Sequence, residues 1–477
     1  MNFDANFRML IEGKLEVGHA SLEVLNPATE KVLAHVPDAT PDDLGRAVDA
    51  ARKAFPSWAA TPLEERKAKL RALGDALMAN AEPLARLLSS EQGKPLAEAT
   101  MEVMGSGYWL HAYTSLDLPV TVNEDSAERY SETRHVPVGV VGAIAPWNFP
   151  LLLAMFKVPP ALLAGNTVVL KPSPFTPLTT LKFGELAAQI LPPGVLNIVT
   201  GGDNLGPWMT SHPGIDKISF TGSTQTGRRV MASAAATLKR VTLELGGNDA
   251  AIVLPDVDVE QVAPQLFWAG FLNNGQVCIA AKRVYIHKDV YEPLKAAIVA
   301  YAKQVKVGEG TADGTQLGPI NNRPQYNRVL DLIQDAKDKG CKFLLGGEKH
   351  SGPGYFVLPT IIDNPPESSR IVQEEQFGPV MPLIRFDDID DVIARVNGTD
   401  FGLAGSIWSK DEDKAYAIAQ RITSGTVWIN EIQHLSPLAA FGGMKQSGIG
   451  VEGGLEGLLE YTSSQTITRR KQAAAAG

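Results

Sequence analysis

The sequence predicts an α/β protein built from two parallel sheets and a small β arm, and three observations support this fold class. Between residues 138 and 246, short apolar segments alternate with helical stretches, which is typical of a doubly wound parallel sheet. After residue 247 the alternation starts again, so a second α/β domain is expected. Residues 118–139 instead carry β-branched residues on both sides of the polar turn 123–126, which predicts a two-stranded ribbon.

The individual elements follow from the same patterns. Extended segments are expected around the turn 26–29, and Thr40 before a proline and two acids predicts the start of a helical region. Helices are expected at 44–55, 61–78, 81–90, 94–116, 150–163, 178–191, 290–305, 326–339, 388–396 and 411–421. Strands are expected at 138–144, 167–170, 195–199, 217–220, 241–243, 250–254, 283–286, 342–345, 380–386, 406–408 and 425–429. The tail 460–469 returns to strand character and is expected to pair with the ribbon, because an isolated hairpin is marginal.

The composition indicates a soluble protein of more than one domain, since 477 residues exceed one ordinary core. The 44 Lys and Arg against 53 Asp and Glu give a net charge of −9, which argues against a nucleic-acid partner. Two cysteines form no disulfide framework, and no Cys/His cluster has the spacing of a metal site. The N-terminus lacks the apolar core of a signal peptide, and the longest apolar run, 150–163, is too short to span a membrane. We therefore expect a cytoplasmic protein.

The segment 271–278, Phe-Leu-Asn-Asn-Gly-Gln-Val-Cys, holds one of these two cysteines. Gly275 allows a close backbone approach, and the thiol of Cys278 can act as a nucleophile where its surroundings favour the thiolate. The alternative is that Cys278 is a small buried hydrophobe, as most free cysteines are. Cys341, next to a predicted strand, is expected to be structural.

Four other polar residues follow predicted strands, where doubly wound sheets bind ligands. They are the amide Asn148, the cation Lys171, Ser223 in a glycine turn that starts a helix, and the carboxylate Glu244. A helix N-terminus can bind phosphate, and an apolar setting would raise the pKa of Glu244 toward that of a general base. Each also has a structural reading: a turn residue, a solvated lysine, an ordinary glycine turn and a capping acid.

Seven motifs in order resemble the NAD(P)-dependent aldehyde dehydrogenase superfamily, of the non-acylating, hydrolytic type. They are Pro-Trp-Asn-Phe-Pro at 146–150, Lys-Pro-Ser at 171–173, Phe-Thr-Gly-Ser at 220–223, Leu-Glu-Leu-Gly-Gly at 243–247, Gly-Gln-Val-Cys at 275–278, Glu-Glu-Gln-Phe-Gly-Pro at 374–379 and Phe-Gly-Gly-Met-Lys-Gln-Ser-Gly at 441–448. The resemblance implies a Rossmann-like cofactor domain (1–117 and 138–246), a catalytic domain (247–446), and an oligomerisation arm with a C-terminal tail (118–137 and 447–477).

The resemblance also implies roles for the chemical residues. Cys278 would attack the aldehyde carbonyl, and the Asn148 side chain with the Cys278 backbone N–H would stabilise the oxyanion. After hydride transfer, Glu244 would activate the water that hydrolyses the thioester; coenzyme A–acylating relatives lack this Glu. Lys171 is counted with both the catalytic and the cofactor residues. Glu452 matches a relay position in relatives, and a surface helix acid is the alternative reading.

The implied cofactor is NAD, with some use of NADP. Trp147 and Ser223 would contact its phosphates, Lys171 the adenosine ribose, and Glu375 the nicotinamide ribose. Phe377 would pack near the nicotinamide, and Gln325 would add a further ribose contact. The remaining cofactor-binding residues are Ser173, Gly222, Gly227 and Leu245. Many strict NAD users carry a Glu where this chain has Pro174, and without that acid a barrier to the 2′-phosphate of NADP is missing.

The positions that match the family's substrate tunnel are all apolar. They are Phe149, Leu153, Phe156, Leu272, Val277, Ile279, Leu435 and Phe441. No arginine for a substrate carboxylate is among them, so a neutral aliphatic or aromatic aldehyde is expected. The alternatives are a semialdehyde or amino-aldehyde dehydrogenase of the same mechanism, or a non-catalytic binding protein of this fold. A homodimer or homotetramer is expected, because the arm presents open strand edges.

Overall fold

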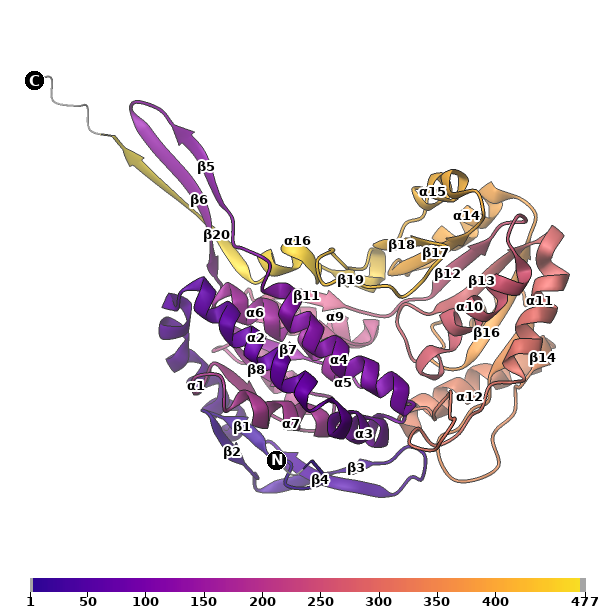
Figure 1. The fold of residues 1–477 in the computed structure, drawn as a ribbon, viewed down its shortest axis with the longest axis horizontal. Coiled ribbons are helices and arrows are strands. Elements are labelled where there is room, and N and C mark those ends of the chain that lie inside the picture. Colours follow the sequence, from indigo (N-terminus) through magenta and orange to yellow (C-terminus); the bar gives the residue numbers. More distant parts are fainter. Residues whose placement is uncertain (1–2, 472–477) are drawn as a thin grey trace, which may run out of the picture.

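The computed structural model describes residues 3–471, and these residues form two lobes and a projecting arm (Figure 1). Residues 1–2 of the predicted cofactor domain and 472–477 of the predicted tail lie outside the described residues. One lobe holds an eight-stranded sheet and the other a seven-stranded sheet. The predicted α/β fold class is confirmed.

The eight-stranded sheet has the order β19-β11-β10-β7-β8-β9-β1-β2, and its central strands are parallel. Its strands are β1 (Met9–Ile11), β2 (Lys14–Glu16), β7 (Val140–Ile144), β8 (Thr167–Lys171), β9 (Leu196–Ile198), β10 (Lys217–Thr221), β11 (Arg240–Glu244) and β19 (Gly448–Ile449). The three strands β7, β8 and β10 are buried along their whole length, as expected for a sheet covered on both faces. The short edge strand β19 comes from the C-terminal region and pairs antiparallel with β11.

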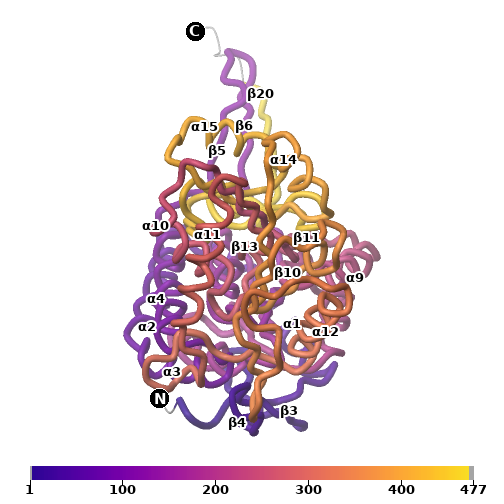
Figure 2. Tube along the Cα trace, turned by 90° about the vertical axis from the view of Figure 1, so that its right-hand side faces the viewer, coloured from indigo at the N-terminus to yellow at the C-terminus, as the bar shows by residue number. Residues whose placement is uncertain are grey.

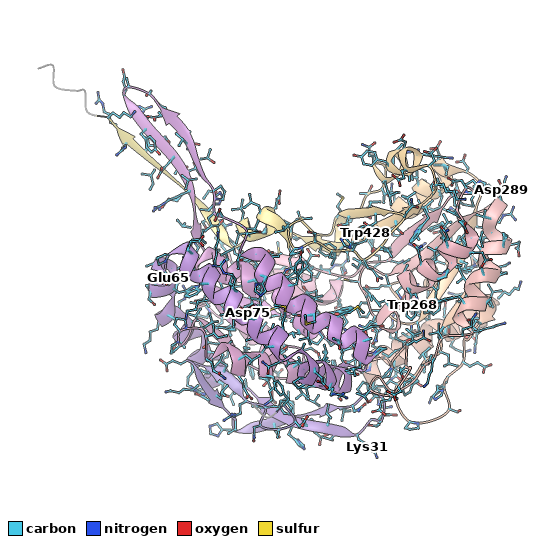
Figure 3. All side chains as sticks on the ribbon, in the orientation of Figure 1. Lys31, Glu65, Asp75, Trp268, Asp289 and Trp428 are labelled. Atoms are coloured by element: carbon cyan, nitrogen blue, oxygen red, sulfur yellow. The ribbon has the colours of Figure 1, made fainter. Side chains whose placement is uncertain are left out.

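Helices cover both faces of this sheet. They are α1 (Pro41–Ala60), α2 (Leu63–Ala79), α3 (Ala81–Gln92), α4 (Leu96–Tyr113), α5 (Pro150–Met155), α6 (Val158–Ala164), α7 (Leu178–Ala187), α8 (Leu205–Ser211), α9 (Thr224–Ala235) and α16 (Gly454–Leu459). Thr40 caps α1 in a reciprocal capping box with Asp43, which confirms the helix start predicted there. Glu65 and Asp75 mark α2 in the outer helical layer, beside α4 (Figure 3).

The seven-stranded sheet has the order β14-β15-β16-β13-β12-β17-β18. Its strands are β12 (Asp249–Val253), β13 (Ala281–His287), β14 (Lys342–Leu345), β15 (Thr360–Asp363), β16 (Val380–Phe386), β17 (Ala404–Trp408) and β18 (Thr426–Ile429). Its helices are α10 (Val259–Phe271), α11 (Lys288–Ala302), α12 (Arg323–Asp338), α13 (Arg370–Gln373), α14 (Ile389–Asn397) and α15 (Glu412–Ala419). Figure 3 labels Trp268 of α10 and Trp428 of β18 in this lobe.

The hairpin of β3 (Ala20–Leu25) and β4 (Val32–Asp38) connects the two lobes. Lys31 marks its turn in Figure 3, at the lower junction of the lobes. There Glu30 accepts a hydrogen bond from Gly354 N at 3.1 Å and forms an ion pair with Arg323, both from the second lobe.

The arm consists of β5 (Val120–Asp125), β6 (Arg129–Pro137) and β20 (Thr462–Arg470), in the order β20-β6-β5. Nine residue pairs join β20 to β6, so the predicted pairing of the tail with the ribbon is confirmed. The arm extends beyond both lobes, as the view turned by 90° shows (Figure 2). Strand β5 reaches Asp125, so the chain reverses at 126–128 and not at the predicted turn 123–126.

Other element predictions were wrong or incomplete. The single helix expected at 150–163 is two helices, because the chain breaks at Phe156 and Lys157 before two consecutive prolines. The strands β1, β2 and β15 and the helix α10 were not predicted. The three strands have only three or four residues each, too few for a clear alternation, and α10 carries Pro264 in its interior. Within residues 3–471, no helix combines the length and the apolar character that crossing a membrane requires.

Candidate active site

Loops from both lobes line a cavity of about 620 Å³. The cavity lies where β7, β10 and β11 end, which is the edge at which parallel α/β sheets bind ligands. Its lining residues are Pro146, Trp147, Asn148, Leu153, Thr221, Gly222, Ser223, Thr224, Gln225, Leu245, Gly246, Cys278, Gln325, Arg328, Gln373, Glu374, Glu375, Phe377, Asp400 and Phe401. Five of the seven motifs found in the sequence thus contribute residues to this cavity.

Cys278 reaches the cavity because the chain turns sharply after α10. Asn273 and Asn274 both have positive φ, at 49° and 55°, and Gly275 follows at 73°. A Cβ at Gly275 would lie 2.1 Å from the Gly378 carbonyl oxygen, so only glycine fits there. Desolvation raises the pKa of the Cys278 thiol well above its ordinary value, and the nearby Glu375 carboxylate adds to this effect. Both effects favour the thiol over the thiolate.

Asn148 stands at the end of β7 and shares the cavity with Cys278. Its side-chain Nδ2 donates a hydrogen bond to the Gln276 carbonyl oxygen at 3.0 Å, two residues before the thiol. An amide nitrogen has two hydrogens, so the second remains available to a ligand oxygen. This contact links the first lobe to the loop of the second lobe that carries Cys278.

Glu244 is the last residue of β11 and is buried, with 4% of its surface exposed. Among the described residues, neither of its carboxylate oxygens has a hydrogen-bond partner. Desolvation raises its pKa well above the ordinary value, and the negative charge of Glu452 raises it further, while Lys157 lowers it. A carboxyl group in this setting is suited to take up a proton near neutral pH.

Glu452 is buried, with 2% exposed, and is therefore not the surface helix acid of the alternative reading. Its Oε1 accepts a hydrogen bond from Lys157 Nζ at 2.5 Å, and Lys157 also donates to Thr221 Oγ1 at 2.7 Å. Lys157 was not among the predicted site residues. A signal existed, because it is the one charged residue in the apolar run 150–163. A buried lysine needs a partner, and only the tertiary structure identifies Glu452 as that partner.

Three predicted cofactor residues line the cavity near the N-terminus of α9: Ser223, Trp147 and Phe377. Ser223 caps α9 by accepting a hydrogen bond from Thr226 N at 3.2 Å, and the free N–H groups of this helix end face the cavity. Trp147 and Phe377 pack edge to face, with ring centroids 5.2 Å apart. This wall combines flat apolar surface with N–H donors, a combination that fits a dinucleotide with its rings and phosphates.

The segment 373–378 forms the opposite wall. Glu375 accepts a hydrogen bond from Gly247 N at 3.0 Å, and burial raises its pKa to about 7. Gln325 on α12 donates through Nε2 to the carbonyl oxygens of Gln376 and Phe377, at 2.9 and 3.0 Å. Gln325 thus supports this wall in addition to lining the cavity.

Three predicted cofactor residues do not line the cavity itself. Lys171 ends β8 and is buried, which lowers its pKa to about 8. Ser173 is also buried, and its Oγ accepts a hydrogen bond from Phe175 N at 3.3 Å. Gly227 lies on α9, where a Cβ would come within 2.5 Å of a Leu245 methyl group. Gly227 therefore allows Leu245 to pack onto this helix.

Most predicted tunnel residues form one apolar cluster around Cys278. The cluster contains Phe149, Leu272, Val277, Ile279, Ala280, Leu403, Ala404, Trp428, Ile432, Leu435 and Phe441. Leu153 lines the cavity next to this cluster. Phe156 is buried in the core of the first lobe, where its ring centroid lies 4.1 Å from that of Trp109. Phe156 is therefore not a member of the cluster around the thiol.

The arrangement defines a class: a two-lobed α/β protein with a thiol, an amide and a buried carboxyl group at the junction of its lobes. The sequence profile described as "Aldehyde dehydrogenase family" matches residues 16–467. Aldehyde dehydrogenase LUC3 from Fusarium sp is 40% identical over 464 residues, which cover 97% of this chain and 98% of the relative.

Two solved structures are similar over nearly the full length. An NAD+ complex of aldehyde dehydrogenase from Bacillus cereus has a TM-score of 0.96 and 37% identity, covering 98% of both chains. An E. coli NADP dependent enzyme has a TM-score of 0.95 and 35% identity, again covering 98% of both. This chain belongs to the aldehyde dehydrogenase family, and it is an enzyme of that family.

Proposed function

We propose that this enzyme oxidises a neutral, apolar aldehyde to a carboxylic acid with NAD(P), using Cys278 as the nucleophile. The observation that carries the proposal is the convergence of Cys278 and Asn148 on one cavity, with Glu244 buried directly behind its wall. The NAD+ complex and the NADP dependent enzyme among the similar structures support a nicotinamide dinucleotide as the cofactor.

In the first step, the Cys278 thiol releases its proton to solvent water, the sulfur attacks the aldehyde carbonyl carbon, and the carbonyl oxygen becomes the oxyanion of a thiohemiacetal. The free N–H of the Asn148 amide and the Cys278 backbone N–H stabilise that charge. Bound NAD(P)+ supplies the hydride acceptor. When the thiohemiacetal loses hydride, its carbon becomes the carbonyl carbon of a thioester on Cys278.

In the second step, Glu244 accepts a proton from a water molecule that attacks the thioester carbon. The C–S bond breaks, the carboxylic acid leaves, and the thiol is restored. The raised pKa of Glu244 suits this role, because a base with an ordinary glutamate pKa would bind the proton too weakly. The Lys157–Glu452 ion pair lies beside Glu244 and supports a proton path from it toward the neighbouring polar groups.

Cofactor selection rests on the environment of Lys171 and position 174. With Pro174 in place of an acid, no carboxylate at that position repels a 2′-phosphate. The negative charges of Asp203 and Asp38 offset part of the lowering that burial causes in the pKa of Lys171, and the same charges favour NAD over NADP. We therefore propose a preference for NAD with measurable use of NADP.

The apolar cluster around Cys278 supports a neutral aldehyde as substrate. Its members offer no cation to a substrate carboxylate and no carboxylate to a substrate ammonium group. The arm and its exposed Val120, Val122 and Ile467 support assembly as a homodimer or homotetramer, because strand edges and apolar side chains are covered in such contacts.

The test measures NAD(P)H formation with an aromatic aldehyde, an aliphatic aldehyde and succinic semialdehyde, in the wild type and in Cys278→Ala. We expect turnover in the wild type, a higher kcat/KM for the neutral aldehydes, and no turnover in the variant, which should still bind NADH. Wild-type levels of activity in Cys278→Ala would overturn the mechanism. A preference for succinic semialdehyde or an amino aldehyde would overturn the substrate class alone.

A further inference from the structure

A buried ion pair lies directly behind Asn148, outside the residues that the reaction employs. Lys94 Nζ and Glu102 Oε2 are 2.6 Å apart, and both side chains are fully buried. Lys94 precedes α4, and Glu102 follows two turns along the same helix. Burying two charges costs free energy unless further hydrogen bonds satisfy both groups. The other hydrogen-bond partners of Lys94 and Glu102 therefore indicate which part of the structure the pair stabilises.

Both charges hold the backbone around Asn148. Lys94 Nζ donates to the Asn148 carbonyl oxygen at 2.8 Å and lies 3.7 Å above the centre of the Phe149 ring. Glu102 Oε1 accepts hydrogen bonds from Leu151 N at 3.0 Å and Leu152 N at 3.2 Å. The ion pair therefore binds the segment after β7 at two points: the carbonyl oxygen of Asn148 itself, and the N–H groups of Leu151 and Leu152 in the first turn of α5.

The same helix also reaches the nucleophile loop in the other lobe. Glu98, one turn before Glu102, accepts a hydrogen bond from Asn273 N at 3.1 Å. Asn273 in turn donates through Nδ2 to the Asn148 carbonyl oxygen at 2.9 Å, the oxygen that Lys94 also binds. Asn273 holds a positive φ of 49°, and the contact with Glu98 fixes the strained turn that leads to Cys278.

We propose that Lys94, Glu98 and Glu102 are positioning residues. They fix the position of the Asn148 amide in one lobe relative to the Cys278 loop in the other. The proposal rests on the proposed function, because it assigns these residues to the oxyanion pocket of that reaction. None of the three side chains lines the cavity, so they act through Asn148 and Asn273 and not on the substrate. A misplacement of about 1 Å in such a pocket lowers the rate about 10²-fold.

The test compares Lys94→Met and Glu102→Gln with a matched control, Lys182→Met. Lys182 also forms a buried pair, with Glu185 at 2.7 Å, but it binds the N-terminal segment at Ala5 and not the site. Two readouts are needed: kcat for aldehyde oxidation, and hydrolysis of p-nitrophenyl acetate, which uses the same thiol and oxyanion pocket without a cofactor. Rates are expressed per NADH-binding site counted by titration, so that unfolded protein is not included.

We expect both Lys94→Met and Glu102→Gln to lose about 10²-fold in both rates, because each removes the Lys94–Glu102 ion pair, while the affinity for NADH stays unchanged. The control should keep the wild-type rates per NADH-binding site. Glu98→Ala should lose activity in the same two reactions, while Glu98→Gln should retain most of it, because its amide oxygen still accepts from Asn273 N.

Wild-type rates per NADH-binding site in Glu102→Gln and Glu98→Ala would overturn the inference, and these two variants decide it even if Lys94→Met does not fold. A loss confined to NADH affinity would overturn it as well. The proposed function fails separately, since it requires aldehyde oxidation in the wild type. If the wild type hydrolyses the ester but oxidises no aldehyde, the variants can still be compared with the wild type by their rates of ester hydrolysis.

Discussion

The two sides of Cys278 differ in chemistry. On the cofactor side, the cavity is lined by hydroxyl, amide and charged groups, such as Ser223, Arg328 and Glu375. On the other side, the thiol is packed against aliphatic and aromatic side chains, among them Leu272 and Phe441. A polar wall can recognise a ligand group by group, whereas an apolar wall distinguishes substrates mainly by size and by the absence of charge.

The position of the thiol between these two sides raises its pKa. The apolar side removes water, and Glu375 on the polar side adds a negative charge, so both raise the pKa of Cys278. A positive charge brought into the cavity would act in the opposite direction and favour the thiolate. Changes on each side should therefore have separable effects, and four substitutions test this.

The largest effect is expected for Glu244→Gln, at the border between the two sides. Acylation of Cys278 should persist as a single burst of NADH, while steady-state turnover falls about 10³-fold because the water is no longer activated. Since the pKa of Glu244 is raised, its basic form grows with rising pH, so wild-type kcat should increase toward alkaline pH. Rapid-mixing absorbance measurements check the burst, and an unchanged pH profile in the variant would contradict this role.

Lys171→Met should weaken the cofactor side alone. We expect KM for NADP to rise about 10-fold, more than KM for NAD, while KM for the aldehyde is unchanged, because a cation near a 2′-phosphate is lost. The pKa of Lys171 is lowered to about 8, so its charge is present below that pH and is lost above it. In the wild type, NADP affinity should therefore fall between pH 7 and 9, and titrations in which the variant keeps that fall would refute the assignment.

Leu435→Arg should reverse the selectivity of the apolar side. A cation in the cluster around Cys278 would attract a carboxylate, so kcat/KM for succinic semialdehyde should rise about 10-fold relative to that for an aliphatic aldehyde. Leu435→Met is the control, because it keeps the apolar character and nearly the same volume. Unchanged ranking of the substrates in the arginine variant would place Leu435 outside the substrate path.

The smallest effect is expected for Ser223→Ala. The substitution removes the N-cap of α9, which should lower the free energy of unfolding by about 1 kcal/mol. It should also raise KM for the cofactor a few-fold without altering the selectivity among aldehydes. Thermal unfolding and cofactor kinetics measured on the same preparation would show whether both changes occur together.

Sequence reasoning predicted the general architecture because apolar periodicity is local information. The alternation of strands and helices from residue 138 gave the parallel sheets, and Thr40 with Asp43 gave the start of α1. It failed where the local pattern is short or interrupted. The strand β15 has four residues, and the prolines after Lys157 divide one predicted helix into two.

The sequence by itself determined the family, and it supplied the residues proposed for the reaction, because Cys278, Asn148 and Glu244 stand in motifs with a specific local order. Only the tertiary structure decided which distant charges meet. Glu452 pairs with Lys157 across 295 positions of the chain, and Lys94 reaches Asn148 across 54. The physical reason is that a buried charge must find a partner in space, and no local pattern states which partner the fold brings to it.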